Sequence, residues 1–92
     1  MKTREDVNKM NPNELVSWFL IASCAYYRFG QRVMLDADFD HLVERLKLSW
    51  KLVSHPHKVL IKQTHLDSTS GFDIDYPNIV IHSANLYLRE IQ

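Results

Sequence analysis

Apolar side chains recur at helical spacing in three stretches of the chain. In residues 12–28 they lie on most sides, which is typical of a central helix buried by several neighbours. In residues 37–53 they form a single stripe, with spacings of three, one, three and four from Phe39 to Trp50. Residues 77–90 repeat a three-four-three spacing. The pattern predicts an all-α fold, in which a hairpin of the first two helices packs with a C-terminal helix.

Local signals mark the ends of these helices. Asn11 can cap the first one, and Glu14 stands three residues later, where its side chain can reach back to the cap. Gly30 is expected to end that helix. Asp36 is predicted to cap the second helix, with Asp38 in its first turn, near the positive end of the helix dipole.

The rest of the chain carries weaker patterns. Residues 1–10 are polar, so we expect a flexible arm, followed by a single helical domain over residues 11–92. Residues 54–76 are expected to be irregular. Within them, residues 64–67 resemble a capping box and predict one helical turn, which Ser70 and Gly71 would stop.

Composition narrows the class of protein. The 92 residues suggest one domain, and 11 basic against 11 acidic side chains leave no net charge. A broad nucleic-acid interface needs a basic excess, so the balance argues against one. A lone cysteine and no apolar stretch long enough to span a bilayer indicate a cytoplasmic protein with no membrane contact.

One group of residues suggests a binding site. Tyr26 and Tyr27 fall on the last turn of the first predicted helix, while Asp36, Phe39 and Asp40 fall on the first turns of the second. In a hairpin these side chains would come together, and aromatic faces beside carboxylates suit a flat cationic ring. A purely structural account, in which the aspartates serve the helix start and the aromatic rings fill the core, stays open beside it.

Other candidate chemistry is weaker. The spacing of the histidines His55, His57, His65 and His82 matches no closed metal site, so we predict no metal. His-Pro-His after a helix more often stops it, with one ring packed or hydrogen-bonded. Cys24 lies inside the most apolar run and is expected to be a buried hydrophobe, not a nucleophile.

The tyrosine–aspartate stretch resembles the N-terminal Ia domain of bacterial NAD-dependent DNA ligases. That domain carries Tyr-His, eight residues, Asp, two residues, Tyr-Asp, one residue and Leu. This chain has Tyr26-Tyr27, eight residues, Asp36, two residues, Phe39-Asp40, one residue and Leu. The ligase-like part covers residues 14–53. The chain also resembles small ligase-related proteins of bacteriophages, whose tails carry His-Pro-His and Tyr-Pro-Asn elements like those at 55–57 and 76–78.

The resemblance implies a site for a nicotinamide nucleotide, NAD or nicotinamide mononucleotide (NMN). Tyr26 would stack on the nicotinamide, and Asp36 and Asp40 would face its positive ring or bind its ribose and amide. Phe39 stands where the family has tyrosine, which removes one hydroxyl. Tyr27 stands where the family usually has histidine, which changes the phosphate or ribose contacts.

The resemblance does not extend to catalysis. No lysine is followed by x-Asp-Gly, the motif that carries the adenylated lysine in ligases. We therefore expect a non-enzymatic module that requires no cofactor and takes NAD or NMN as a ligand. If the chain is phage-encoded, it would act in the cytoplasm of the host cell.

Two alternatives accompany this expectation. The helical scaffold could instead bind or inhibit a host or phage protein such as a ligase, a nuclease or a defence factor. Aromatic residues beyond the needs of a small core would then be exposed as anchors: Trp18, Phe19, Phe29, Trp50 and Phe72. A weaker alternative is nucleic-acid binding through a basic strip: Arg28, Arg32, Arg45, Lys47 and Lys51.

Overall fold

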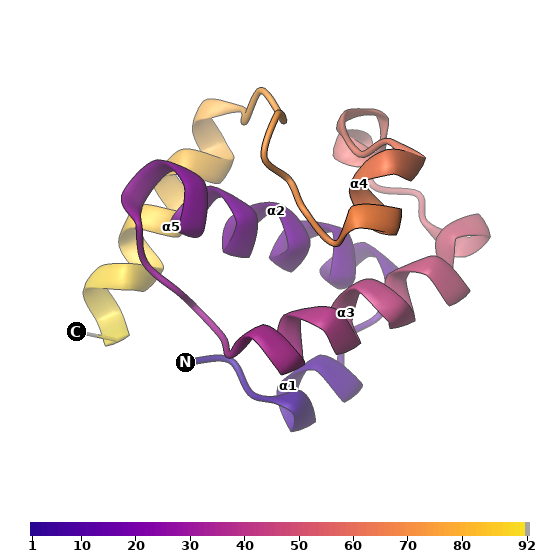
Figure 1. Ribbon diagram of the computed structural model, residues 1–92, viewed down its shortest axis with the longest axis horizontal. Coiled ribbons are helices and arrows are strands. Elements are labelled where there is room, and N and C mark those ends of the chain that lie inside the picture. The colour runs from indigo at the N-terminus through magenta and orange to yellow at the C-terminus, as the bar shows by residue number, and fades with distance from the viewer. Residues whose placement is uncertain (92) are drawn as a thin grey trace.

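The chain folds into helices joined by short connections (Figure 1). The structure is a computed structural model and describes residues 1–91. The α-helices are α1 (Arg4–Asn8), α2 (Pro12–Phe29), α3 (Asp36–Leu48), α4 (Gln63–Ser68) and α5 (Asn78–Ile91). Two short 3₁₀ helices, η1 (Trp50–Leu52) and η2 (Pro56–Leu60), lie between α3 and α4. No strand occurs within residues 1–91, so the predicted all-α class is confirmed.

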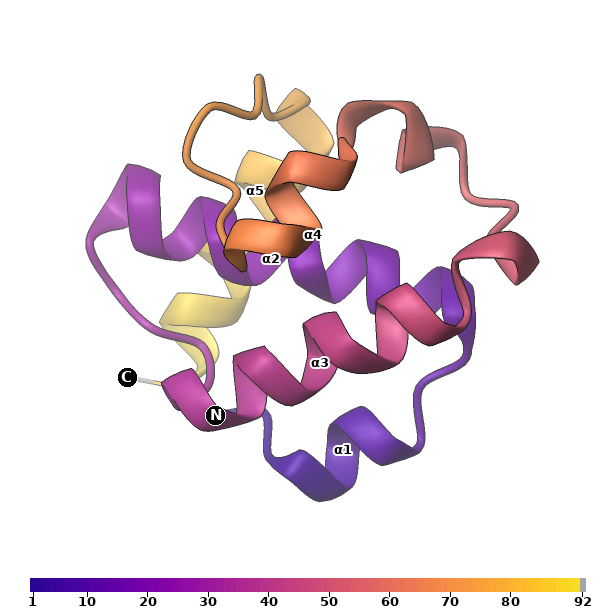
Figure 2. The same ribbon diagram turned by 45° about the vertical axis from the view of Figure 1, so that its right-hand side comes forward.

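Helix α2 is the centre of the molecule. It packs against α3 on one side and against α5 on another, while α1 lies along α3 (Figures 1 and 2). Eight of its residues are buried, as its nearly continuous apolar sequence predicts. In contrast, α3 buries only one stripe, formed by Leu42, Val43 and Leu46. The predicted roles of the two hairpin helices are therefore both confirmed.

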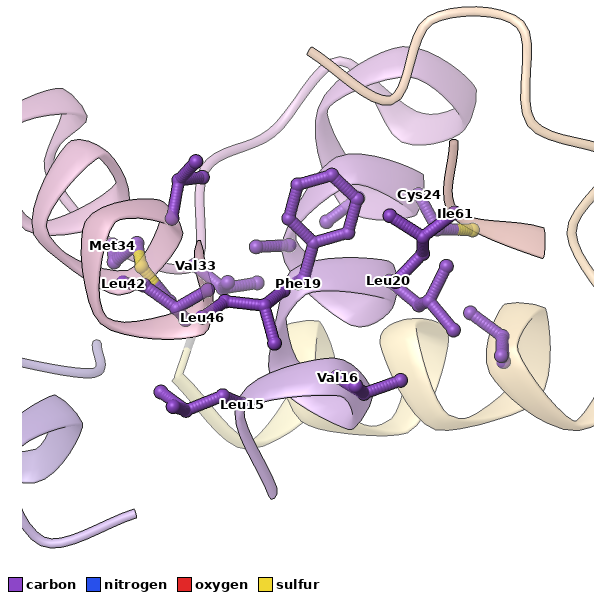
Figure 3. Packing of buried hydrophobic residues seen from close by; sticks show 14 of the residues in the cluster. Leu15, Val16, Phe19, Leu20, Cys24, Val33, Met34, Leu42, Leu46 and Ile61 are labelled. Atoms are coloured by element: carbon purple, nitrogen blue, oxygen red, sulfur yellow. The ribbon is translucent and has the colours of Figure 1, made fainter. Parts of the chain in front are cut away.

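The core forms around the two sides of α2 (Figure 3). Leu15 and Phe19 lie on the side that faces Leu42 and Leu46 of α3, and Cys24 lies toward Ile61 on the other side. The Phe19 ring is fully buried and stacks on the ring of Phe39, with 5.6 Å between the ring centroids. Phe39 is half-buried, so this stack connects the core to the surface at the start of α3.

The predicted ends of α2 are confirmed. The Asn11 side chain accepts a hydrogen bond from the Glu14 amide at 2.8 Å, and the Glu14 carboxylate accepts one from the Asn11 amide at 3.0 Å. Pro12 occupies the first turn, where no amide donor is needed. Gly30 ends the helix in a left-handed conformation with φ of 65°, which glycine adopts without steric cost.

The predicted cap of the second helix is wrong. Leu35 is the N-cap residue, and its carbonyl accepts from the amides of Asp38 and Phe39. Asp36 is already the first helical residue, and its carboxylate is turned back to the Arg32 side chain. The helix therefore starts without a side-chain cap. Helix α3 also ends at Leu48, and the expected extension to residue 53 is a break followed by η1.

The expected loose arm at residues 1–10 contains a packed helix instead. Thr3 and Asp6 form a capping box at the start of α1. Val7 and Met10 are buried in the core. The Arg45 guanidinium of α3 donates hydrogen bonds to the carbonyl oxygens of Val7 and Met10, which fastens this segment to α3. The capping box, the two buried apolar side chains and the two Arg45 hydrogen bonds together hold this polar segment in place.

Residues 54–76 are more regular than expected. They contain η2 and α4, and α4 begins after Lys62, one residue before the predicted turn. Helix α4 ends at Ser68, and its C-cap residue Thr69 takes the left-handed conformation. The helix therefore stops just before Ser70 and Gly71, where the sequence predicted the stop. Gly71 has another role, because a Cβ there would lie 2.7 Å from the Ser23 Cβ. The loop can therefore approach α2 closely.

Helix α5 confirms the predicted C-terminal helix. It starts at Asn78, directly after Pro77, whose carbonyl accepts from the amides of Val80 and Ile81. Val80 and Leu88 are buried on its inner face, whereas Ile79 is exposed. No helix within residues 1–91 is long and apolar enough to cross a membrane.

Candidate functional site

A cleft of about 360 Å³ opens between the C-terminal end of α2 and the N-terminal end of α3. All five residues expected from the sequence to bind a ligand line it: Tyr26, Tyr27, Asp36, Phe39 and Asp40. The hairpin brings them together because the connector of residues 30–35 returns the chain beside the end of α2. The rest of the wall comes from Ala22 and Ser23, from Arg32, Val33 and Met34, and from Ser68, Thr69 and Ser70.

The two tyrosines provide an exposed aromatic wall. Tyr26 and Tyr27 are 48% and 40% exposed, although they end the most buried helix of the molecule. Their rings meet edge to face, with centroids 4.9 Å apart. Exposed aromatic rings at the mouth of a cleft offer stacking faces for a flat ligand. The alternative account, in which the aromatic rings fill the core, therefore does not hold for Tyr26 and Tyr27.

Tyr27 also holds the far wall in place. Its hydroxyl lies 2.8 Å from the Ser70 hydroxyl, and its ring packs edge to face against Phe72. These contacts join residues 43 and 45 positions apart in the sequence, and they bring the end of α4 over the cleft. Because its hydroxyl is already hydrogen-bonded, Tyr27 acts in this site through its ring and its hold on the loop.

The Arg32 guanidinium contacts both Asp36 and Tyr26. The Arg32 Nε lies 3.0 Å from Asp36 Oδ1, and Nη2 lies 3.4 Å from Oδ2, which makes the pair bidentate. The same guanidinium lies 5.5 Å from the centre of the Tyr26 ring. A planar cation therefore already occupies the position between a carboxylate and an aromatic face.

Asp40 is the remaining acidic group of the cleft. It lies one helical turn after Asp36 on the same face of α3, and its side chain is exposed. Within residues 1–91 it makes no hydrogen bond or ion pair. Too far from the helix start to serve as a cap, its charge is left to face the cleft. Asp40 thus gives the cleft one carboxylate that no neighbour neutralises.

Sequence reasoning missed two parts of this site. Arg32 was assigned to a basic surface strip, and no helical spacing predicts its pair with Asp36, because Arg32 lies in the irregular connector before α3. The wall from Ser68 to Ser70 carries no local signal, because α4 reaches the cleft only through the tertiary fold. Phe39 forms the floor, supported from below by Phe19.

A second, shallower depression lies beside the first, around His65 and Asp73. His65 is buried, and its Nδ1 accepts a hydrogen bond from the Lys62 amide at 2.9 Å. Its Nε2 therefore carries the ring hydrogen and donates a hydrogen bond to the Asp73 carboxylate. Both ring nitrogens are committed, so this pair fastens the loop after α4 and offers no free base for catalysis.

This pair predicts a loss of stability in acid. The hydrogen bond from His65 holds the pKa of Asp73 below its ordinary value. A carboxyl whose pKa is lower in the folded state stabilises that state at neutral pH, and the contribution is lost as the pH falls through the folded-state pKa. We expect the melting temperature to fall from about pH 5 to about pH 2, and to fall less in Asp73→Asn. Circular dichroism melts across this range measure both.

The neighbouring Asp75→Asn exchange is the matched control, because Asp75 is also exposed but makes no such bond within residues 1–91. It should show the same acid-induced fall as the parent chain. An equal fall in the Asp73→Asn variant would contradict the assigned role of the pair.

The His-Pro-His element and Cys24 both take up structural positions in the fold. His55 caps η2, accepting from the His57 amide at 3.0 Å, and its Nε2 lies 2.9 Å from the Ser17 hydroxyl. One ring of the His-Pro-His element is hydrogen-bonded, as expected, but the element starts η2 and does not stop a helix, since α3 already ends at Leu48. Cys24 is fully buried, and burial raises the pKa of its thiol. Across residues 1–91 no three His, Cys, Asp or Glu side chains are grouped to hold a metal ion.

The basic strip is largely engaged within the molecule. Arg32 pairs with Asp36, and Arg45 donates to backbone carbonyls of the N-terminal segment. Lys47 lies 3.7 Å from an Asp67 carboxylate oxygen. Of these three side chains, Arg45 is the one held in a part-buried position.

Comparison with protein-family models, with curated proteins and with solved structures finds no match for this chain.

Proposed function

We propose that this chain is a non-catalytic helical module that binds a nicotinamide nucleotide, NAD or NMN, in the cleft between α2 and α3. The observation that carries the proposal is the convergence of Tyr26, Tyr27, Asp36, Phe39 and Asp40 on that single cleft. The resemblance to the ligase Ia domain, which closes over the NMN half of NAD, supplies the ligand class. In a bacteriophage such a module would sense or sequester the nucleotide, or assist an NAD-dependent ligase.

The charges of the cleft favour a single cationic ring. Asp36 and Asp40 supply two carboxylates, and Arg32 supplies one guanidinium, which leaves one net negative charge. The oxidised nicotinamide ring is flat and positively charged, so it suits a tyrosine face beside a carboxylate. The reduced ring is neutral and is expected to bind less well.

The test is calorimetric titration of the chain with NMN and with its reduced form. We expect Asp40→Asn to weaken binding of oxidised NMN about fivefold, as the loss of one partly exposed charge contact would, and to change binding of the reduced form little. Glu44→Gln is the matched control, since Glu44 lies one turn further along α3 and outside the cleft. It should leave both affinities unchanged.

Two results would refute this function. The first is an absence of heat with NMN and with NAD at millimolar concentration in the folded chain. The second is an equal effect of Asp40→Asn and Glu44→Gln on oxidised NMN, because charge in the cleft would then have no local role.

A second candidate function is the binding of a protein partner, and one observation favours it. Leu48, Leu52 and Val59 are large apolar residues that are 74–84% exposed, and they fall in consecutive segments from the end of α3 to η2. Among the aromatic residues considered as anchors, only Phe72 is largely exposed, at 73%. Phe19 is fully buried, and Trp18, Phe29 and Trp50 are partly buried against the core.

A further inference from the structure

Arg32 stands where the cation of the proposed ligand would lie. Its guanidinium is planar and positively charged, it pairs with Asp36 in a bidentate manner, and it lies over the Tyr26 ring. A nicotinamide ring would lie over the same aromatic face and bring its positive charge to the same carboxylate, without the two N–H donors of the guanidinium. The chain thus fills its own cation position with a side chain from the connector.

The pair is also suited to opening. The side chains of Arg32 and Asp36 are 53% and 80% exposed, and an ion pair this exposed contributes little to stability. Arg32 lies in the connector between α2 and α3, where no helical backbone holds its side chain in one direction. A long, exposed arginine can turn away from Asp36 without unpacking any part of the core.

We propose that Arg32 exchanges partners when the ligand binds. The positive ring of the ligand takes the place of the guanidinium between Tyr26 and Asp36, and Arg32 turns to the phosphate of the same ligand. This inference rests on the proposed nicotinamide-nucleotide function. It deepens that function by naming the ligand class as molecules that carry both a flat cation and a phosphate.

The exchange gives Arg32 opposite effects on two ligands. For a cation without a phosphate, such as nicotinamide riboside, Arg32 is only a competitor, and binding must break its contacts with no return. For NMN the released guanidinium gains a charge-assisted hydrogen bond to the phosphate. One side chain therefore selects against the dephosphorylated ligand and in favour of the phosphorylated one.

The experiment compares the parent chain with Arg32→Gln by titration calorimetry against nicotinamide riboside and NMN. Removal of the competitor should raise the affinity for the riboside about threefold. For NMN, loss of the phosphate contact, worth about fifteenfold by itself, outweighs the same gain and should lower the net affinity about fivefold. Lys51→Gln removes the same charge from a position outside the cleft. It should leave the ratio of the two affinities unchanged. Circular dichroism verifies that each variant is folded.

The possible results test the Arg32 exchange separately from nicotinamide-nucleotide binding itself. Opposite shifts for the two ligands support the exchange. Shifts in the same direction, or no shift, overturn it and leave nicotinamide binding in place. A folded parent chain that binds neither ligand overturns the proposed function itself. If Arg32→Gln and Lys51→Gln changed the ratio of the riboside and NMN affinities equally, the effect would come from the net charge of the chain. This result would also overturn the exchange.

Discussion

Replacement of Phe19 by alanine is expected to lower the free energy of unfolding by about 3–5 kcal/mol. Phe19 is fully buried in the middle of α2, and its ring stacks on Phe39 at a centroid distance of 5.6 Å. The substitution removes apolar surface from the core and leaves a cavity that the surrounding helices fill only in part. Domains of this size have total stabilities near the lower end of about 5–15 kcal/mol, so the variant should be close to unfolding.

The effect should reach the cleft as well, because Phe39 rests on Phe19 and forms the floor beside Asp36 and Asp40. Urea denaturation followed by tryptophan fluorescence measures the change in stability. Phe72→Ala is the matched control, since that ring is 73% exposed and packs mainly on Tyr27. It should cost less than about 1 kcal/mol. A loss in Phe19→Ala as small as that of the control would contradict the assigned core.

Replacement of Arg45 by methionine is the second large effect, with an expected cost of about 2–3 kcal/mol. The methionine keeps an apolar stem but removes the donors that serve the carbonyl oxygens of Val7 and Met10. Hydrogen bonds from a charged group are the stronger kind, and these are partly shielded from water. The loss should fall on α1, since Arg45 fastens that segment to α3.

Amide hydrogen exchange locates this effect. The Val7 amide donates a hydrogen bond to the Thr3 carbonyl at 3.0 Å. It should exchange faster in Arg45→Met than in the parent chain, while the amides in the middle of α2 should remain the most strongly protected. Lys47→Met is the control, because Lys47 takes part only in a surface ion pair with Asp67 within residues 1–91. It should cost less than about 1 kcal/mol and leave α1 unchanged. Uniform acceleration across all helices would argue against a local role for Arg45.

The elements that the sequence predicts well are those whose signals lie within a few residues. The capping box of Asn11 and Glu14 and the left-handed Gly30 set both ends of α2 through contacts no more than five residues long. The period of apolar positions sets the buried stripe of α3 in the same way. Asp36 shows where local signals fail. Aspartate favours the N-cap position, but here Asp36 is the first residue of the helix and its carboxylate pairs with Arg32 of the connector.

The sequence by itself determined the all-α class, the hairpin and the set of side chains that meet beside its connector. Those properties depend on helical period, on capping and on a connector too short to separate the two helices. Only the tertiary structure decided that residues 4–8 form a helix on α3, that α4 covers one wall of the cleft and that Arg32 lies over Tyr26. The contacts that fix α1 and α4 join positions about 35 to 43 residues apart, and no local pattern carries them. Arg32 lies closer in sequence, but its direction is set by the path of a connector that has no period of its own.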